Sequence, residues 1–197
     1  MFRRFLLWES EAASIAGETL SMDPDVSADY ESLIRDILDF PQPGVLFRDI
    51  TPLLSNAAAL RAVVKDLAAP FRDDGVDQVA AIEARGYLLG APVAVELGAG
   101  LVPIRKIGKL PFETYRVEYA LEYGQAAIEM HRDGLESHHR VLLVDDVLAT
   151  GGTMAAAINL VEQSGATIAG IAFLIELKDL GGRDLLKGYN AVALMTL

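Results

Sequence analysis

Two adjacent aspartates, Asp145 and Asp146, follow the apolar run VLLV in the stretch VLLVDDVLATGGT over residues 141–153. A short apolar run of this kind is typical of a buried strand in a parallel sheet. Ligands of open parallel sheets bind at the carboxyl ends of the strands, and the two carboxylates lie at such an end. They would face a group that donates hydrogen bonds, as the hydroxyl groups of a ribose do.

The loop after the aspartates has the composition of an anion-binding loop. Gly151 and Gly152 allow backbone N–H groups to approach a ligand closely, and Thr150 and Thr153 add hydroxyl donors. A helix is expected directly afterwards, over residues 154–164, and a helix N-terminus favours negative charge. The loop therefore suits a phosphate.

Each half of this pattern has another interpretation. Paired aspartates at a strand end also occur in metal and phosphoryl-acceptor sites, and a Gly-Gly turn before a helix is often only a tight connection. Other nucleotide loops do not fit, because no lysine precedes Thr153 as in a P-loop and no GxGxxG stretch occurs. The two halves at this spacing favour a ribose-phosphate site.

The elements around this stretch alternate between short apolar runs and helical patterns. This alternation predicts an α/β fold with a mainly parallel central sheet and helices on both faces. Tyr30, Leu33, Ile34, Ile37 and Leu38 recur at helical spacing, which predicts a helix capped by Ser27 and ended by FPQPG. The other expected strands are 78–82, 101–104, 126–130, 141–144, 168–177 and 191–195, and the other expected helices are 86–97 and 154–164.

Residues 105–125 are polar and aromatic without a helical period. Long irregular segments in compact domains are often functional, so this one is expected to form a flexible flap or hairpin that stands off the sheet.

Charge and composition exclude several classes of protein. The net charge of −11 makes the chain a poor general binder of nucleic acid. The absence of cysteine excludes disulfides and thiolate metal sites and fits a reducing compartment. The apolar stretch GYLLGAPVAVELGAGLVPI is interrupted by Glu96, prolines and glycines, so a helix, a turn and a strand are expected there instead of a membrane span.

The front of the chain lacks a sustained pattern. Its opening apolar run ends at Glu9, too early for a signal peptide, and Met22 is a candidate for the natural start. We expect residues 1–25 to be a loosely ordered extension and residues 26–197 to be a single domain with a small N-terminal hood.

The motifs together resemble those of a known family. VLLVDDVLATGGT resembles the phosphoribosyl pyrophosphate (PRPP) signature of the type I phosphoribosyltransferases, and between about Tyr30 and Leu180 the chain resembles the adenine phosphoribosyltransferases among them. The motifs that stand in that family's order and spacing are FPQPGVLFRDITPLL, ARGYLLG, IRKIGKLP and LEYG.

The resemblance implies transfer of a phosphoribosyl group from PRPP to adenine, giving AMP and pyrophosphate. It also implies Mg²⁺ held mainly by PRPP and water, with no metal site made by the protein alone, as well as a homodimer and a cytoplasmic location. No nucleic-acid or membrane partner is expected. Two rivals remain open, a PRPP-sensing regulator without catalysis and an enzyme for another base such as xanthine or orotate.

A strongly anionic chain needs a local positive patch to bind PRPP, and residues 85–109 contain four basic residues against the single acid Glu96. By resemblance, Arg85, Arg105 and Lys109 contact the pyrophosphate, and Arg105 reaches across a dimer interface. Fixed cations on a leaving pyrophosphate stabilise charge that grows in the transition state.

The resemblance also assigns the acid that works near the base. Glu122 in LEYG matches a glutamate that acts near N7 of adenine, although a lone surface glutamate is the ordinary alternative. Ala149 stands where enzymes for 6-oxopurines carry an aspartate, which disfavours hypoxanthine and guanine.

The base pocket is expected to form from PGVLFRD, with the backbone of Leu46 and Arg48 reading the edge of adenine. Phe47 is either a wall of that pocket or plain core, and Leu177 matches a residue near the base. In the turn EARG, Ala84 suits a place where backbone approaches the pyrophosphate, and the resemblance predicts a cis peptide between Glu83 and Ala84.

Overall fold

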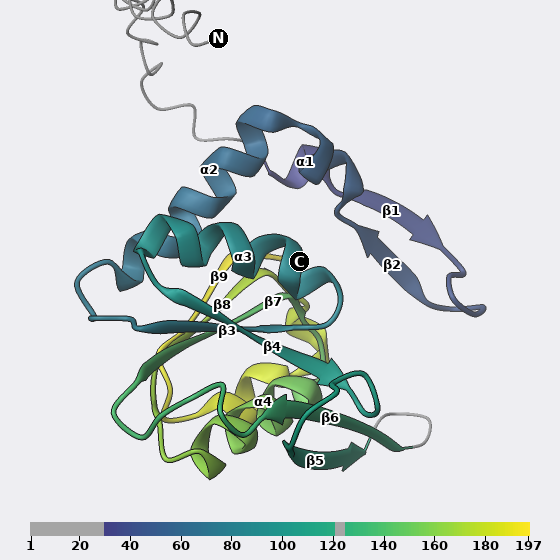
Figure 1. Cartoon of the computed structure of the whole chain (residues 1–197). Helices are drawn as coiled ribbons and strands as arrows, with labels where there is room; N and C mark the ends of the chain where they lie inside the picture. The colour runs from purple at the N-terminus through teal and green to yellow at the C-terminus, as the bar shows by residue number, and fades with distance from the viewer. Residues whose placement is uncertain (1–29, 121–124) are drawn as a thin grey trace, which may run out of the picture.

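The computed structural model describes residues 30–120 and 125–197. Its centre is a seven-stranded sheet, and a separate two-stranded sheet lies near the start of the described chain (Figure 1). The strands are β1 (Arg35–Leu38), β2 (Leu46–Asp49), β3 (Gln78–Ile82), β4 (Gly100–Lys106), β5 (Thr114–Ala120), β6 (Gln125–His131), β7 (Arg140–Leu148), β8 (Thr167–Glu176) and β9 (Ala191–Thr196). The α-helices are α1 (Thr51–Ser55), α2 (Ala57–Ala68), α3 (Arg85–Leu97) and α4 (Gly152–Gln163), and the 3₁₀ helices are η1 (Glu31–Leu33), η2 (Ala69–Phe71), η3 (Lys178–Leu180) and η4 (Gly182–Leu186).

The central sheet has the order β5-β6-β4-β3-β7-β8-β9. The pairs from β4 through β3, β7 and β8 to β9 are parallel, whereas β6 is antiparallel to both of its neighbours. This is the α/β fold with a mainly parallel sheet that the alternating pattern predicts. The carboxyl ends of β3, β7 and β8 therefore meet at one edge, where a ligand site is expected.

Helices cover both faces of the sheet, with α2 and α3 on one face and α4 on the other (Figure 1). Strand β7 shows why, because its side chains alternate between two buried clusters. Val141 and Leu143 pack with α4, and Leu142 and Val144 pack with α2 and α3. A strand buried on both faces reads as a continuous apolar run, which accounts for VLLV.

The predicted strands are confirmed, with longer bounds in several cases. Strand β7 extends to Leu148, so Asp145 and Asp146 lie inside the strand and not after it, and the predicted end at residue 144 is wrong. Helix α2 was not predicted. Its N-terminus is capped by Asn56, whose side chain accepts hydrogen bonds from the N–H groups of Ala58 and Ala59.

The helix predicted from Tyr30, Leu33, Ile34, Ile37 and Leu38 is wrong. The chain makes one 3₁₀ turn at η1 and then forms β1, which pairs antiparallel with β2. Cross-strand ion pairs join Arg48 to Asp36 and Arg35 to Asp49. Pairing with a strand that follows the turn overrides a local helical spacing. The proposed cap Ser27 and the extension 1–25 lie outside the described residues.

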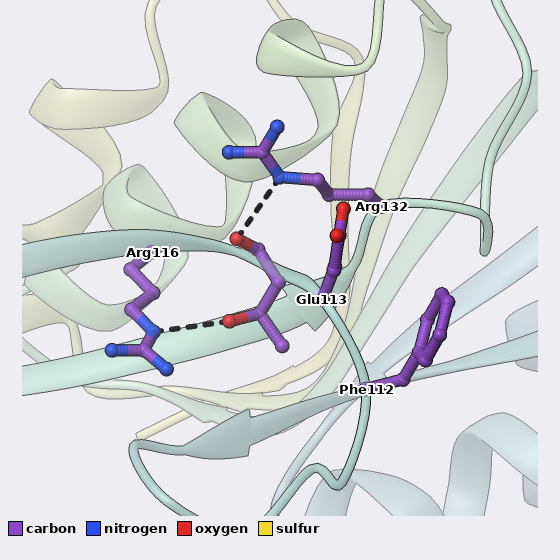
Figure 2. Close-up of a pocket in the computed structure, with 5 residues that line it drawn as sticks. Phe112, Glu113, Arg116 and Arg132 are labelled. Atoms are coloured by element: carbon purple, nitrogen blue, oxygen red, sulfur yellow. Dashed lines mark hydrogen bonds between the residues drawn. The ribbon is translucent and has the colours of Figure 1, made fainter.

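Within the described part of the segment 105–125, a loop over residues 107–113 leads into β5, which pairs with β6 as a β-hairpin at the sheet edge. Strands β5 and β6 pair along their length, but β6 pairs with β4 only at Arg105↔Glu129 and Lys106↔Ile128. The hairpin therefore stands partly off the sheet, as predicted. Figure 2 shows the start of β5, where the Nε–H groups of Arg116 and Arg132 donate to the hydroxyl and the carbonyl oxygen of Thr114.

The apolar stretch GYLLGAPVAVELGAGLVPI contains most of α3, a left-handed turn at Gly98 and the first five residues of β4, as the expected helix, turn and strand. None of the helices in residues 30–120 and 125–197 has the length and hydropathy that a membrane crossing requires.

Candidate active site

The two aspartates lie against the N-terminus of α3. A side chain at Gly86 would place its Cβ 2.8 Å from Asp145 Oδ1 and 3.0 Å from the carbonyl oxygen of Val144, so only glycine lets the helix approach β7 this closely. The peptide between Glu83 and Ala84 is cis, as predicted. Arg85 begins α3 beside the acidic pair, with its Nε 2.7 Å from Asp146 Oδ2.

The acidic pair is electrostatically unfavourable in the free protein. Burial, and then the neighbouring carboxylate of Asp146, raise the pKa of Asp145 well above its usual range. Burial also raises the pKa of Asp146, and the positive charge of Arg85 partly offsets that rise. Asp146 Oδ2 makes no aligned hydrogen bond within the described chain despite its close contact with Arg85. That oxygen is buried against Arg85, whereas the partly exposed Asp145 lines a cavity and can accept from a hydroxyl-bearing ligand.

The loop from Ala149 to Gly152 turns sharply into α4. Gly151 has φ of +83°, and Gly182 packs directly behind it. A Cβ on Gly151 would meet the Gly182 carbonyl oxygen at 2.5 Å, and one on Gly182 would meet the Ala149 carbonyl oxygen at 2.2 Å. The backbone at Gly182 thus packs directly against the backbone of the loop at Gly151. The first N–H groups of α4 have no acceptor within the helix and can bind an anion.

A cavity of about 640 Å³ joins this loop to β2. Its lining contains eight of the predicted site residues, namely Leu46, Phe47, Arg48, Arg85, Ala149, Thr150, Thr153 and Leu177. Asp145, Gly151 and Gly152 line a smaller cavity of about 70 Å³ that shares Ala149, Thr150 and Thr153 with the larger one. The structure therefore brings most of the expected base and ribose-phosphate residues together, although Asp146 is buried and lines neither cavity.

Phe47 is a wall of the large cavity and not plain core. The guanidinium of Arg85 lies over its ring at 5.0 Å from the centroid, and the ring meets Phe40 edge-on at 5.1 Å. These contacts hold the ring while one side faces the cavity.

Gly44 and Val45 of the expected stretch PGVLFRD also line this cavity, and sequence reasoning missed two lining residues, Val147 and Leu180. Val147 lies two residues after Asp145 on β7, so the two-residue period of a strand could have identified it. No comparable signal marks Leu180, which lies in a 3₁₀ turn after β8.

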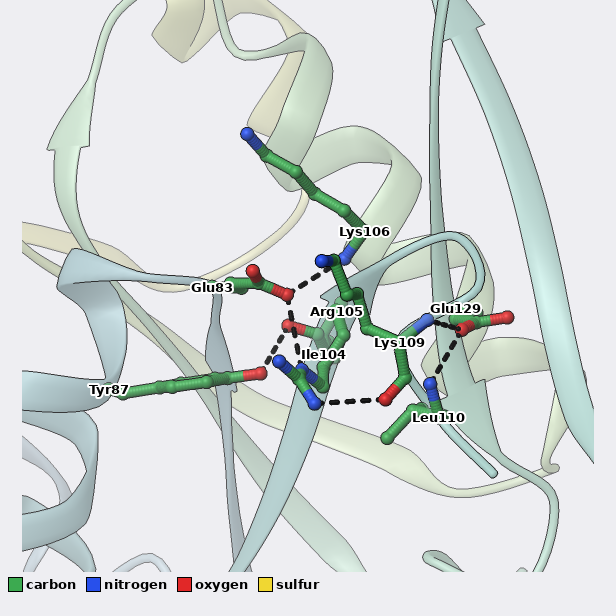
Figure 3. Close-up of polar contacts among 8 residues, drawn as sticks. All are labelled: Glu83, Tyr87, Ile104, Arg105, Lys106, Lys109, Leu110 and Glu129. Carbon is green, nitrogen blue, oxygen red and sulfur yellow. Dashed lines mark hydrogen bonds and ion pairs between the residues drawn. The ribbon is translucent and has the colours of Figure 1, made fainter. Parts of the chain in front are cut away.

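Arg105 and Lys109 lie at the end of β4 and in the loop that follows, and neither lines the two cavities. Arg105 Nε donates to Glu83 Oε2 at 3.1 Å, and Arg105 Nη1 donates to the carbonyl oxygen of Lys109 at 2.9 Å (Figure 3). The N–H of Lys106 also donates to Glu83. Arg105 is thus held by its own chain at this edge. The predicted catalytic residue Glu122 lies outside the described residues.

Comparison with known proteins identifies the family. The phosphoribosyl transferase domain matches residues 53–189. The chain belongs to the phosphoribosyltransferase family. It is 58% identical over 170 residues to the adenine phosphoribosyltransferase of Nocardioides sp., a match that covers 84% of this chain and 92% of that protein.

Solved phosphoribosyltransferase structures share the fold. The adenine phosphoribosyltransferase of Thermoanaerobacter pseudethanolicus is 47% identical with a TM-score of 0.83, over 85% of this chain and 98% of that one. The Saccharomyces cerevisiae enzyme, complexed with adenine and an iminoalditol bisphosphate, is 34% identical with a TM-score of 0.79, over 84% and 96% of the two chains. In this phosphoribosyltransferase the basic residues Arg85, Arg105, Lys106 and Lys109 all lie near the carboxyl edge of the sheet, although the chain as a whole is acidic.

Proposed function

We propose that the protein transfers the 5-phosphoribosyl group of PRPP to adenine, giving AMP and pyrophosphate. The observation that carries the proposal is the large cavity, because it joins a pocket with apolar walls to the anion-binding loop of α4. A base and a ribose phosphate must lie side by side in one cavity for a bond to form between them. The names of the similar proteins supply adenine as the acceptor.

The acidic pair and the loop before α4 position the ribose phosphate. We assign the ribose hydroxyls to the carboxylates of Asp145 and Asp146, which accept hydrogen bonds from them. The 5-phosphate then lies on the loop from Ala149 to Thr153, where backbone N–H groups and two threonine hydroxyls donate. In the ligand-free protein Thr153 Oγ1 donates to the Tyr119 hydroxyl at 3.2 Å, so this hydroxyl must turn from Tyr119 to the phosphate when the phosphate binds.

The base lies between the walls of the large cavity. We assign one wall to Phe47 and the other to Leu177, with the backbone of Leu46 and Arg48 reading the edge of the ring. The side chain of Arg48 is paired with Asp36, so it is held by β1. Ala149 adds no charge beside the base, consistent with the choice of adenine over a 6-oxopurine.

In the reaction, N9 of adenine forms a bond to C1 of the ribose while the bond from C1 to the pyrophosphate oxygen breaks. The leaving group takes the electron pair, so negative charge grows on it. We place four residues around that charge, namely Arg85, its backbone neighbour Ala84, Arg105 and Lys109. We propose Glu122 as the carboxylate that interacts with N7 and assists removal of the proton from the base.

The residues at this edge fit a magnesium ion that arrives with the substrate. No group of three or more His, Asp or Glu residues in the described segments is arranged to hold a metal, but an ion with mostly phosphate and water ligands needs no such group. Asp145 and Asp146 are the residues that would hold it through its ligands. Its chemistry there is neutralisation of charge on the pyrophosphate.

We also propose that the protein is a cytoplasmic homodimer. Leu88 and Val95 on α3 and Leu101 on β4 are large apolar side chains exposed on the single chain, at 51%, 81% and 43%. Burial of such groups favours association. The lack of cysteine is consistent with a reducing compartment.

The direct experiment offers PRPP and Mg²⁺ together with adenine, hypoxanthine, guanine, xanthine or orotate, each in a separate reaction. We expect AMP from adenine, and rates at least about a hundredfold lower from the 6-oxopurines, whose exchanged donors and acceptors leave buried polar groups unpaired. A faster reaction with another base would contradict the assignment of adenine. Binding of PRPP without transfer to any base would instead favour a regulator of the same fold.

A further inference from the structure

The loop that carries Lys109, residues 107–113, is attached to a buried carboxylate. Glu129 lies in β6, opposite Arg105 of β4 and Arg116 of β5, and its exposed fraction is 0%. Oε1 accepts hydrogen bonds from the backbone N–H groups of Lys109 and Leu110, both at 3.0 Å (Figure 3). Thr114 Oγ1 donates to Oε2 at 3.3 Å, and Arg116 Nε lies 3.4 Å from the same oxygen.

A buried carboxylate is unfavourable unless it is well satisfied, so these contacts decide its charge. Burial alone would raise the pKa of Glu129. The hydrogen bonds from the N–H groups of Leu110 and Lys109, followed by that from Thr114, outweigh burial and hold the pKa below its usual range. The group is therefore ionised at neutral pH.

The four contacts come from both ends of the loop. Lys109 and Leu110 lie on its β4 side, whereas Thr114 and Arg116 belong to β5. One carboxylate thus joins the two ends. The start of β5 is held further because Arg116 and Arg132 both donate to Thr114 (Figure 2).

The backbone of Lys109 is fixed on both of its polar groups. Its N–H donates to Glu129, and its carbonyl oxygen accepts from Arg105 Nη1 at 2.9 Å. The long side chain is then the part of Lys109 that is left to move. Fixing the backbone limits where the ammonium can reach and lowers the entropy lost when it meets an anion.

We propose that Glu129 is a positioning residue of the transfer reaction, whose buried carboxylate fixes the backbone of Lys109 and so aims its ammonium at the pyrophosphate of PRPP. This inference rests on the proposed function. The loop is then anchored at two places, at residues 109–110 by Glu129 and at residues 113–114, where the carbonyl oxygen of Glu113 accepts from the N–H of Arg132 at 2.9 Å and Thr114 donates to Glu129.

The first readout is amide hydrogen exchange in the ligand-free protein. The amides of Lys109 and Leu110 should already be protected in the wild type, and Glu129→Gln should accelerate their exchange by at least about tenfold, since a neutral amide is a weaker acceptor than a carboxylate. Equal exchange at these two amides in both proteins would overturn the inference.

The second readout separates positioning from stability. We expect Glu129→Gln to raise the KM for PRPP by about tenfold or more with the KM for adenine within about twofold, since small displacements of binding groups are costly. Val161→Ala, at a buried site on α4, is the control because it lowers stability without touching the loop. If the two variants lose similar stability and both keep the wild-type KM for PRPP, Glu129 is only structural.

The third readout asks whether Glu129 acts through Lys109. Lys109→Met should weaken PRPP binding, and adding Glu129→Gln to it should change the KM for PRPP by less than about twofold, because coupled residues are not additive. Full additivity would overturn the inference. Should Glu129→Gln fail to fold, Thr114→Val removes one donor, and the same measurements apply with smaller changes.

The outcomes distinguish this inference from the proposed function. If the wild type forms no AMP from adenine and PRPP, the proposed function fails, while the exchange of the two amides still decides whether Glu129 anchors the loop. If AMP forms and Lys109→Met impairs it but Glu129→Gln does not, only the positioning role fails.

Discussion

Changing both Asp145 and Asp146 to asparagine should nearly abolish turnover while the protein stays folded. Two charge-assisted hydrogen bonds to the ribose would be weakened, each worth about 1.5–3 kcal/mol. Together they correspond to a loss of PRPP affinity of at least about a hundredfold. Calorimetric titration with PRPP and Mg²⁺, beside a steady-state assay, measures both effects. Unchanged PRPP affinity in a folded double variant would contradict the assignment of the pair.

The single variant Asp145→Asn is expected to be more stable than the wild type at neutral pH. The pKa of Asp145 is raised in the folded protein, so its ionisation disfavours the fold as pH rises through that raised pKa. A neutral amide lacks this penalty. The melting temperature should rise by about 2–4 °C for each kcal/mol relieved, and the difference should vanish in acid, where the wild-type carboxyl is protonated. A variant that melts lower at neutral pH would show that the carboxylate stabilises the fold.

Arg85→Gln gives the second large effect. We expect kcat/KM for PRPP to fall by about 10²–10³-fold, because a fixed cation on the leaving pyrophosphate is lost. Removal of this charge also raises the pKa of Asp146 further, since Arg85 is the main influence that lowers it. The activity of the variant should therefore recover partly as pH is raised, when Asp146 ionises more fully. Steady-state rates over a range of pH measure both effects.

Arg72→Gln is the matched control for Arg85→Gln. The two arginine side chains are almost equally exposed, at 42% and 41%, and each pairs with a carboxylate, Arg72 with Glu96 on α3. Arg72 lies away from the acidic pair, so its loss should leave kcat/KM within about twofold, as for most exposed ion pairs. Similar losses in both variants would indicate a general effect of charge and not a contact at the site.

The local pattern of apolar residues predicted the strands correctly where a strand is buried on both faces. The runs VLLV and QVAAI predicted β7 and β3, since a continuous apolar strand of this length needs helices on either side. The same reasoning failed over residues 30–38, where helical spacing exists but β1 forms because β2 supplies its partner. A pairing partner that follows a turn is not visible in a window of eight or nine residues.

The sequence was sufficient to predict the residues that could bind the substrate, but not the residues that hold them in place. The aspartates, the glycine-rich loop and the basic residues are visible as residue types at suitable spacing. Gly182 behind Gly151, and Glu129 beneath Lys109, depend on contacts between segments far apart in the chain. Such contacts have no local signature, because a glycine in a turn or a glutamate in a strand reads as ordinary until the fold places it.

The structure of the protein with AMP bound tests the central claim most directly. We expect the 5-phosphate within hydrogen-bond distance of backbone N–H groups between Ala149 and Thr153, and the ribose hydroxyls on Asp145 and Asp146. Adenine should lie in the large cavity, between Phe47 and Leu177. A phosphate bound away from the start of α4, or a base bound away from the β2 wall of that cavity, would show that the proposed substrate site is wrong.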